Sequence, residues 1–512
     1  MRWLKRLSLT LLTLALLLGL TAWWALRASL APLDGAVAVP GLSAPATLER
    51  DERGYVSIAA ANRLDAARAL GYAHAQERFF QMDLLRRNAA GELAELVGAQ
   101  AVDLDKSRRW HRFRARSIAW VATMPAEERA LVQSYAAGVN AGLAALGGRP
   151  PEYWLLRQRP KPWQEADSLL VLFSMYLDLQ GAQGRDDLAT GWAKAQRPPE
   201  WFSFLTQHSA DWQAALDDSR VEPVPMPSSP WPALLRDSKT ACADCDGPDA
   251  RDIGSNNFAV AASRSTQGRA ILADDMHLGL RVPGTWFKAR LQWQAEGRRF
   301  DMAGVTLPGA PILVAGSNGF VAWGFTNTGP DVQDLYIEQL RPGDPAQYRT
   351  PEGWARFETA VETIKVKGQP DVAFAQRRTR HGPVISDAGT VSDVLGPRDR
   401  PAFALAMRWT ALDADSDAVG TALAMQSASS VATFMQATRS LVAPMQNMVV
   451  ADDAGHIGMV SPGRVPLRKP DNDLKGQVPA PGWDARYDWA GWIPADETPR
   501  QLDPASGFIA SA

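Results

Sequence analysis

This chain contains little cysteine and histidine, and its net charge is small. Its 512 residues include two cysteines and six histidines, and the formal net charge is -2. The cysteines form one Cys-x-x-Cys pair, Cys242 and Cys245, so a zinc site built from two such pairs is excluded. We prefer a local disulfide or free thiols in a connecting segment over a redox motif or half a zinc site. No basic stripe is present, which argues against a nucleic-acid partner.

The chain is too long for one simple domain and shows no internal repeats. Its 512 residues compare with roughly 100–200 residues for a typical domain. A basic start, an apolar run from Leu9 to Leu26 and a small-residue segment at 28–31 form a targeting pattern. The apolar run is also close to the shortest that spans a membrane. We expect residues 1–31 to be a signal peptide of a periplasmic or exported protein, with a membrane anchor as the alternative.

The first third of the chain is predicted to be mostly helical. Residues 32–62 look extended, with a turn at 51–54. From Asn62 onward, apolar residues recur at steps of three and four, which is typical of a helix. Further helices are predicted after Pro125, where acidic residues fill the first turn, and over 167–179.

Residues 218–254 differ in composition from what precedes and follows them. Prolines crowd the start of this segment, acidic residues crowd its end, and no periodicity is visible. Such a connector is exposed and easily cut by proteases. After it, short strands are predicted at 258–261, 270–273, 312–315, 321–325, 363–366 and 447–451.

The motifs at and after this boundary carry a resemblance to a known family. Gly254-Ser255-Asn256-Asn257-Phe258 is followed by Asp274-Asp275-Met276-His277 and then by Trp323-Gly324-Phe325-Thr326-Asn327-Thr328-Gly329-Pro330-Asp331. In this order they resemble the penicillin acylase family of N-terminal nucleophile hydrolases, and the resemblance covers residues 35–512. It implies an α+β fold with a four-layer αββα core.

The resemblance also implies that the chain cuts itself before Ser255. Residues 32–217 would form an α-chain, 218–254 a spacer removed on maturation, and 255–512 a β-chain, giving an α/β heterodimer from one precursor. The β-chain ends in a strand-like run at 506–512. We expect its C-terminal portion to be missing, together with an asparagine that supplies one oxyanion-hole donor in the family.

An N-terminal serine carries its own base. A serine hydroxyl is a weak nucleophile that needs a base within hydrogen-bond reach. The α-amine of a terminal serine has a reference pKa of about 7.7–8.0 and is partly neutral near pH 7. Ser255 therefore needs no separate histidine and aspartate once it is the first residue. Gly254 before it allows the strained backbone that self-cleavage requires.

Two further catalytic residues are implied by the resemblance. His277 stands where the family has a glutamine or histidine, and we expect it to orient Ser255 or its α-amine by hydrogen bonding. The backbone N–H of Asn327 is expected to be one donor of the oxyanion hole, which must already point at the charge that develops on the substrate oxygen.

The resemblance further implies a structural calcium site and no organic cofactor. Calcium prefers several oxygen ligands, including backbone carbonyls. The expected ligands are Asp186, Asp331, Gln333, Asp334 and the backbone of Gly476.

These observations predict a self-processing amidohydrolase that acts on linear amides of small acyl compounds. His277 favours aliphatic acyl substrates, including acyl-homoserine lactones. Two other classes stay open. One is an unprocessed, non-catalytic exported binding protein, and the other is a membrane-anchored, peptide-directed hydrolase with a conventional Ser-His pair.

Overall fold

The structure is a computed structural model that describes residues 2–207, 219–229, 254–295, 297–388, 402–413 and 417–511. The chain divides into two compact units. The first holds Met1–Met175, Arg281–Gly319 and Ile364–Val372, and the second holds Tyr176–Leu280, Phe320–Thr363 and Ala373–Ala512. The Cys242–Cys245 pair and most of the predicted spacer lie outside the described residues. The described part of the spacer, 219–229, contains neither helix nor strand.

Helices dominate the described residues before the spacer, as the sequence predicts. They are α1 (Arg2–Ala28), α2 (Arg63–Ala90), α3 (Ala94–Val97), α4 (Val102–Arg109), α5 (Phe113–Thr123), α6 (Ala126–Ala144), α7 (Pro151–Leu155), α8 (Glu165–Gln180), α9 (Gln183–Gln196) and α10 (Pro199–Leu205). The helix predicted from Asn62 is confirmed, because the Asn62 side chain caps α2 by accepting a hydrogen bond from the Asp65 N–H. The helices predicted after Pro125 and over 167–179 are α6 and α8.

By length and composition, α1 is able to cross a membrane, and none of its side chains is buried. A signal sequence near an N-terminus has the same properties. The helix is therefore compatible with both fates expected for residues 1–31.

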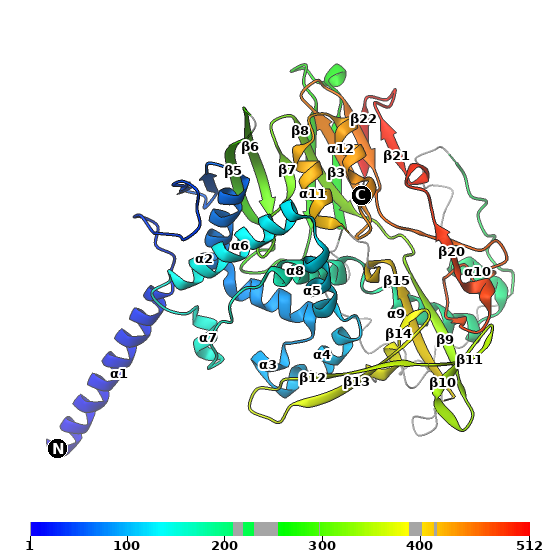
Figure 1. The fold of residues 1–512 in the computed structure, drawn as a ribbon, viewed down its shortest axis with the longest axis horizontal. Coiled ribbons are helices and arrows are strands. Elements are labelled where there is room, and N and C mark those ends of the chain that lie inside the picture. The colour runs from blue at the N-terminus through cyan, green and yellow to red at the C-terminus, as the bar shows by residue number, and fades with distance from the viewer. Residues whose placement is uncertain are drawn as a thin grey trace. The chain divides into compact units, whose positions relative to one another are not determined.

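In the first unit, α2 and α6 pack along each other beside a sheet (Figure 1). The two helix backbones come close because glycines lie at the contact: a Cβ at Gly71 would overlap the Tyr135 carbonyl, and one at Gly138 would overlap that of Arg68. The strands of this unit follow the order β1 (Thr47–Arg50), β2 (Val56–Ala59), β5 (Phe287–Ala295), β6 (Arg298–Thr306) and β7 (Leu313–Ser317). Only β2 and β5 are parallel among the pairs recorded for these described strands.

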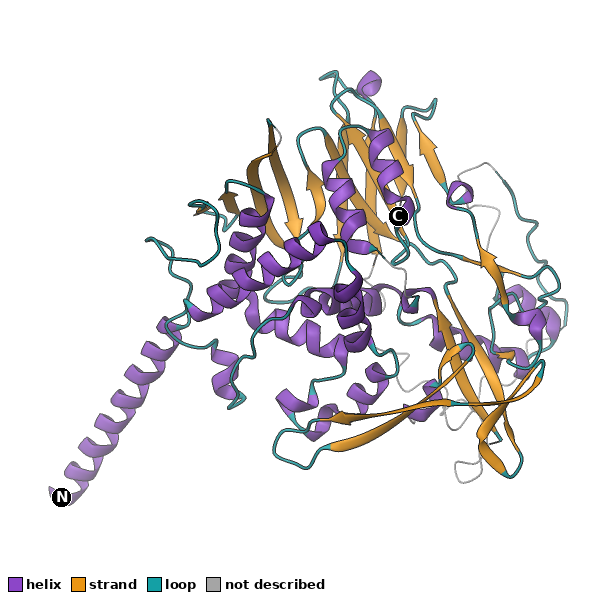
Figure 2. Ribbon diagram, viewed as in Figure 1, coloured by secondary structure: helices purple, strands orange, loops and turns teal. Residues whose placement is uncertain are grey.

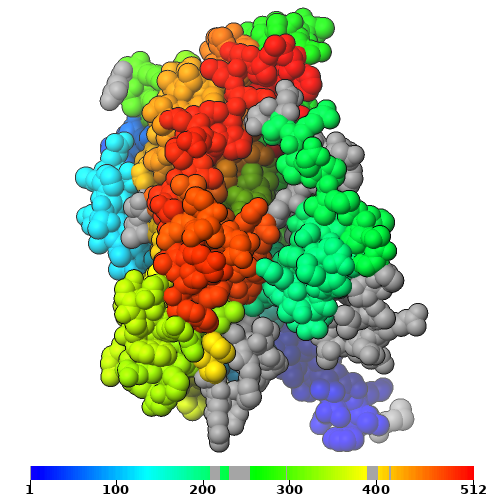
Figure 3. Space-filling model, turned by 90° about the vertical axis from the view of Figure 1, so that its right-hand side faces the viewer, coloured from blue at the N-terminus to red at the C-terminus, as the bar shows by residue number. Residues whose placement is uncertain are grey.

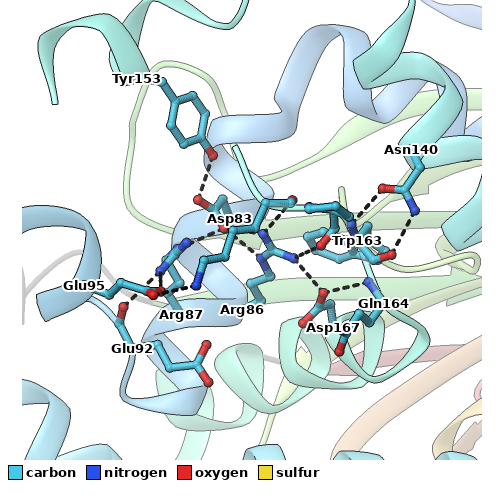
Figure 4. A network of polar contacts seen from close by, with 12 residues as sticks. Asp83, Arg86, Arg87, Glu92, Glu95, Asn140, Tyr153, Trp163, Gln164 and Asp167 are labelled. Carbon is cyan, nitrogen blue, oxygen red and sulfur yellow. Dashed lines mark hydrogen bonds and ion pairs between the residues drawn. The ribbon is translucent and has the colours of Figure 1, made fainter. Parts of the chain in front are cut away.

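A buried ion network holds the helices of the first unit together (Figure 4). The Asp83 carboxylate lies 2.7 Å from Nη2 of Arg86 and 3.0 Å from Nε of Arg87, and it accepts a 2.6 Å hydrogen bond from the Tyr153 hydroxyl. Arg86 also lies 2.6 Å from Asp167 on α8. The charged residues around Asp83 thus serve helix packing in this unit.

The second unit contains two sheets packed face to face with helices on one outer side (Figures 1 and 2). One sheet has the order β8 (Val321–Asn327), β16 (Gln446–Asp452), β17 (Ile457–Val460) and β21 (Arg500–Leu502). The other has the order β22 (Phe508–Ser511), β3 (Gly254–Val260) and β4 (Ile271–His277). Helix α12 (Val431–Ala437) packs on β16 and β17, and α11 (Ala418–Ser427) packs on α12. The fold is α+β, with a helix–sheet–sheet order in this unit.

An apolar core lies between these two sheets. Ala259, Val449, Ile457 and Ile509 are buried there, with Leu272 packed against them. Since strand side chains alternate between faces, the same face of β3 that carries Ala259 also carries Ser255 and Asn257. The core therefore fixes which face of β3 the serine occupies.

The remaining described strands are β9 (Gln333–Arg341), β10 (Asp344–Thr350), β11 (Gly353–Arg356), β12 (Glu358–Ile364), β13 (Val372–Thr379), β14 (Gly382–Pro383), β15 (Phe403–Trp409), β18 (Pro466–Arg468), β19 (Ala480–Pro481) and β20 (Trp489–Trp492). The strand predicted at 363–366 is only partly right, because β12 ends at Ile364. On the surface of the second unit, the last residues of the chain, orange and red in Figure 3, lie beside the green segment that precedes the spacer.

Candidate active site

Ser255 is the second residue of β3 and lies at the bond that we expect to be cut. Its hydroxyl donates a 2.6 Å hydrogen bond to the carbonyl of Gly254. Gly254 and Ser255 pair with β4, and β22 joins β3 on its other side from Asn257 onward. The backbone around the expected cleavage point is thus held in a regular ladder, with the hydroxyl against the carbonyl of the Gly254–Ser255 peptide.

His277 lies beside Gly254, on the face of the ladder opposite to the Ser255 side chain. Gly254 pairs with His277 and Ser255 pairs with Met276, and paired residues share a face. A Cβ placed on Gly254 would lie 3.6 Å from Nδ1 of His277. Nε2 of His277 lies 2.9 Å from the Asp275 carboxylate. The histidine is therefore placed against the residue before the nucleophile, and its expected role in orienting Ser255 stays a prediction.

Asn327 ends β8, which packs against β3 and β4. Its side chain is engaged at both ends: Oδ1 accepts a 2.7 Å hydrogen bond from Gln446, and Nδ2 donates to the Leu179 carbonyl at 3.1 Å. These bonds hold the end of the strand in place. The expected oxyanion-hole role belongs to the Asn327 backbone N–H and stays a prediction.

A polar layer between the two sheets was missed by the sequence analysis. Asn447 donates a 2.7 Å hydrogen bond to Ser511, and Thr326 lies 2.9 Å from the same hydroxyl. Ser461 donates to Oδ1 of Asn447 at 2.5 Å, and Asn257 donates to the Asn447 carbonyl at 3.4 Å. The layer follows Ser255 on the inner face of β3, where the apolar core ends.

Asp274 is the acidic member of this region. It lies opposite Asn257 in the β3–β4 ladder, and its carboxyl group is seated against Gly324 of β8. Both carboxyl oxygens are enclosed and have no side-chain hydrogen-bond partner among the described residues. Burial raises the pKa of Asp274 to about 7; the Asp275 charge adds to the rise, and the nearby Phe325 N–H offsets it only in part.

An arginine lies among the carboxylates expected to bind calcium. Nη2 of Arg468 is 2.9 Å from Asp331 and also forms an ion pair with Asp334. Trp489 donates a 2.8 Å hydrogen bond to the same Asp334 carboxylate. A Cβ on Gly476 would overlap the Arg468 guanidinium, so this glycine makes room for the cation.

Gln333, another expected calcium ligand, is engaged away from Asp331 and Asp334. Gln333 accepts a hydrogen bond from the Gly184 N–H at 3.0 Å and donates to the Gln180 carbonyl at 2.8 Å. Asp187, the neighbour of the expected ligand Asp186, is affected by the charges of Asp331 and Asp334. Burial, and after it these two charges, raise the pKa of Asp187 to about 8. No group of three or more metal-ligating side chains suited to an ion exists among the described residues. As arranged, these residues do not fit calcium, because Arg468 supplies the positive charge.

Two histidines outside the site have structural surroundings. His74 is buried between the Tyr135 hydroxyl, 2.7 Å from Nδ1, and the Thr306 hydroxyl, 2.9 Å from Nε2. Burial lowers the pKa of His74 to about 3, so it is neutral. His381 lies 2.8 Å from Glu338 and stacks on Tyr336 with ring centroids 3.6 Å apart.

Comparison with known proteins decides the family. The family model for penicillin amidase matches residues 45–512. The chain belongs to the penicillin amidase family. This confirms the family expected from the motifs around Ser255, His277 and Asn327.

Relatives in the penicillin amidase family include acylases with different named substrates. The chain is 35% identical over 505 residues to penicillin acylase 2 proenzyme of Pseudomonas sp. (strain SE83), covering 95% of this chain and 61% of the relative. It is 32% identical over 493 residues to acyl-homoserine lactone acylase QuiP of Pseudomonas aeruginosa, covering 94% and 56%. The chain thus spans about three fifths of the length of these curated relatives.

A solved structure, the thermostable penicillin G acylase from Alcaligenes faecalis, is also similar. It is 29% identical, with a TM-score of 0.43, and the match covers 50% of this chain and 43% of that one.

Proposed function

We propose that the protein is a self-processing acylase that hydrolyses linear amide bonds through an acyl-enzyme on Ser255. One observation carries the proposal: the Ser255 hydroxyl lies in hydrogen-bond contact with the Gly254 carbonyl, at the start of a paired strand. Membership of the penicillin amidase family supports it.

Self-cleavage would use this contact directly. The Ser255 oxygen attacks the Gly254 carbonyl carbon, the peptide C–N bond breaks, and the freed nitrogen takes up the hydroxyl proton. Water then hydrolyses the resulting ester, which leaves a carboxylate on Gly254 and a free amine and hydroxyl on Ser255. The products are an α-chain and a β-chain that stay together as a heterodimer.

Substrate hydrolysis would follow with the new α-amine as the base. The amine takes the Ser255 hydroxyl proton while the oxygen attacks the acyl carbonyl. The Asn327 N–H donates to the oxyanion that forms. The amine product leaves with a proton, and water, deprotonated by the α-amine, releases the acid.

The substrate class follows from the relatives by similarity. Penicillin acylase and acyl-homoserine lactone acylase both cleave an acyl group from an amine, and both names occur among the relatives. We propose small acyl amides as substrates. Acyl-homoserine lactones are the second candidate, favoured by His277. The apolar helix α1 supports export, with membrane anchoring as the alternative.

The test is to locate the acyl-enzyme in protein expressed from its natural gene. Phenylacetyl and fatty-acyl anilides should give a burst of aniline equal to the enzyme concentration. A serine-directed sulfonyl fluoride should abolish the burst and label the peptide that begins at Ser255. The variant Ser255→Ala should lose both burst and label, whereas Ser263→Ala, at an exposed serine in the short 3-10 helix Ala262–Arg264 after β3, should keep both. A burst that persists in Ser255→Ala would contradict the proposal.

A further inference from the structure

The side chains of Asn257 and Asp274 are neighbours on one face of the β3–β4 ladder, and Asn257 comes two residues after the expected nucleophile. Asn257 and Asp274 are direct partners in the β3–β4 ladder, and side chains so paired lie on one face with Cβ atoms about 4.5–5.5 Å apart. Nδ2 of Asn257 is committed to the Asn447 carbonyl, which leaves Oδ1 in need of a donor. The Asp274 carboxyl oxygens have no side-chain partner among the described residues, and the backbone N–H of Phe325 is the one donor near them.

An ionised Asp274 carboxylate cannot supply the donor that Oδ1 of Asn257 needs, because a carboxylate accepts hydrogen bonds and donates none. A protonated carboxyl does, since its O–H is a donor. We propose that Asp274 is a positioning residue whose protonated carboxyl donates a hydrogen bond to Oδ1 of Asn257 and so fixes β3 next to Ser255. The positioning role rests on the proposed function, whereas the hydrogen bond itself does not.

The surroundings of Asp274 favour the neutral form. Gly324 leaves space for the carboxyl group but offers it no side-chain partner. Strands β3 (Gly254–Val260) and β8 (Val321–Asn327) carry no charged residue. The acidic residue of β16, Asp452, lies at the far end of that strand and is bonded to the Val431 and His456 N–H groups.

The remaining charged neighbours lie on β4 itself. Asp275 and His277 lie on the opposite face and contact each other. Asp275 adds negative charge, which disfavours ionisation of Asp274. Of these neighbours, the Phe325 N–H of β8 favours the ionised form, and burial together with the Asp275 charge outweighs it.

The hydrogen bond would matter most after self-cleavage. Ser255 then becomes the free end of β3, and chain ends fray unless they are tied down. A hydrogen bond between Asp274 and Asn257 would hold β3 two residues after Ser255 and on the same face as the Ser255 side chain. It would keep the hydroxyl and the α-amine in one place.

The conservative substitution separates this role from simple packing. In Asp274→Asn the amide N–H can replace the O–H at every pH, whereas in Asp274→Leu the shape is kept and the donor is lost. We expect Asp274→Asn to cleave itself and hydrolyse acyl anilides like the wild type. We expect Asp274→Leu to lose at least tenfold in kcat and to process more slowly.

The pH dependence of unfolding gives a readout independent of activity. A carboxyl whose folded pKa is raised contributes stability that is lost as pH rises from its unfolded pKa, about 3.9, through its folded pKa, about 7. The wild type should therefore lose stability relative to Asp274→Asn across this interval. The control Asp275→Asn removes an exposed acid one residue away; because the Asp275 charge contributes to the raised pKa of Asp274, the pH interval should narrow slightly, but the loss of stability with rising pH should persist.

Each outcome decides one claim. If wild type and Asp274→Asn show the same pH slope, the protonated hydrogen bond is refuted. If Asp274→Asn loses activity as Asp274→Leu does, the positioning role is refuted. If neither the wild type nor any variant cleaves itself or hydrolyses substrate, the proposed function fails. The hydrogen bond still stands in that case, provided that the pH slopes of unfolding differ as expected. If Asp274→Leu does not fold, infrared spectroscopy takes its place as the test. We expect a protonated-carboxyl band in the wild type below the pKa of Asp274 and no such band in Asp274→Asn. Absence of the band from the wild type would overturn the proposal.

Discussion

Replacing Arg468 by methionine should make the stability of this chain respond to calcium. The Arg468 side chain is 15% exposed and its partner Asp334 is 5% exposed, so the pair is largely desolvated. Removing one partner of a buried pair typically costs about 3–5 kcal/mol of unfolding free energy, because the other charge is left uncompensated. We expect a loss in this range for Arg468→Met in the presence of a chelator.

Calcium should restore part of that loss. Without the guanidinium, Asp331 and Asp334 are free to offer oxygen ligands, with Asp187 close enough for their charges to raise its pKa. An ion that binds only the folded state adds about 2.7 kcal/mol when its concentration is 100 times the Kd. The assay is thermal unfolding of wild type and variant with EGTA, with calcium, and with magnesium as a control ion.

The wild type should unfold at the same temperature in EGTA and in calcium. A matched control is Arg439→Met, which removes an arginine from the exposed pair with Asp496 and should show no calcium response. A wild-type unfolding temperature that falls in EGTA would refute the reasoning, because an ion would then bind beside Arg468 and the arginine would not replace it.

Three other predictions test packing and targeting. Asp83→Asn removes the negative charge that Arg86 and Arg87 share, and it should lower the free energy of unfolding in denaturant by about 3–5 kcal/mol. The control Asp496→Asn, at an exposed ion pair, should cause no measurable change. Gly324→Ala places a methyl group on the Cβ and Cγ of Asp274 and should cost about 1–3 kcal/mol by the same assay. Deleting α1 should move the protein from the exported or membrane fraction to the cytosol, and an unchanged distribution on cell fractionation would exclude a targeting role for this helix.

Local patterns in the sequence were enough to locate helices and part of the strand that carries Ser255. Helix α2 follows from apolar periodicity and from the capping residue Asn62. Strand β3 was predicted at 258–261, whereas it begins at Gly254. Ser-Asn-Asn has little strand propensity, and pairing with β4 extends the strand across these polar residues, with β22 joining at Asn257.

Relations between distant strands could not be predicted. Whether His277 shares a face with Ser255 depends on the register of β3 and β4, and a shift of one residue would reverse the answer. The seat of Asp274 against Gly324 depends on how two sheets pack. Arg468 meets Asp334 from 134 residues away, and nothing near either residue in the sequence signals the contact. Motif order therefore identified the family and the strand of the expected nucleophile, whereas the pairing of Arg468 with Asp334 could be seen only in the fold.

The most direct test of the central claim is the N-terminus of the β-chain. Protein expressed from its natural gene, beside Ser255→Ala, would be measured by intact mass and N-terminal sequencing. The account predicts two chains in the wild type, one beginning Ser-Asn-Asn-Phe at Ser255, and a single uncut chain in the variant. A wild type with an intact Gly254–Ser255 bond that still hydrolyses acyl amides would contradict the N-terminal nucleophile mechanism.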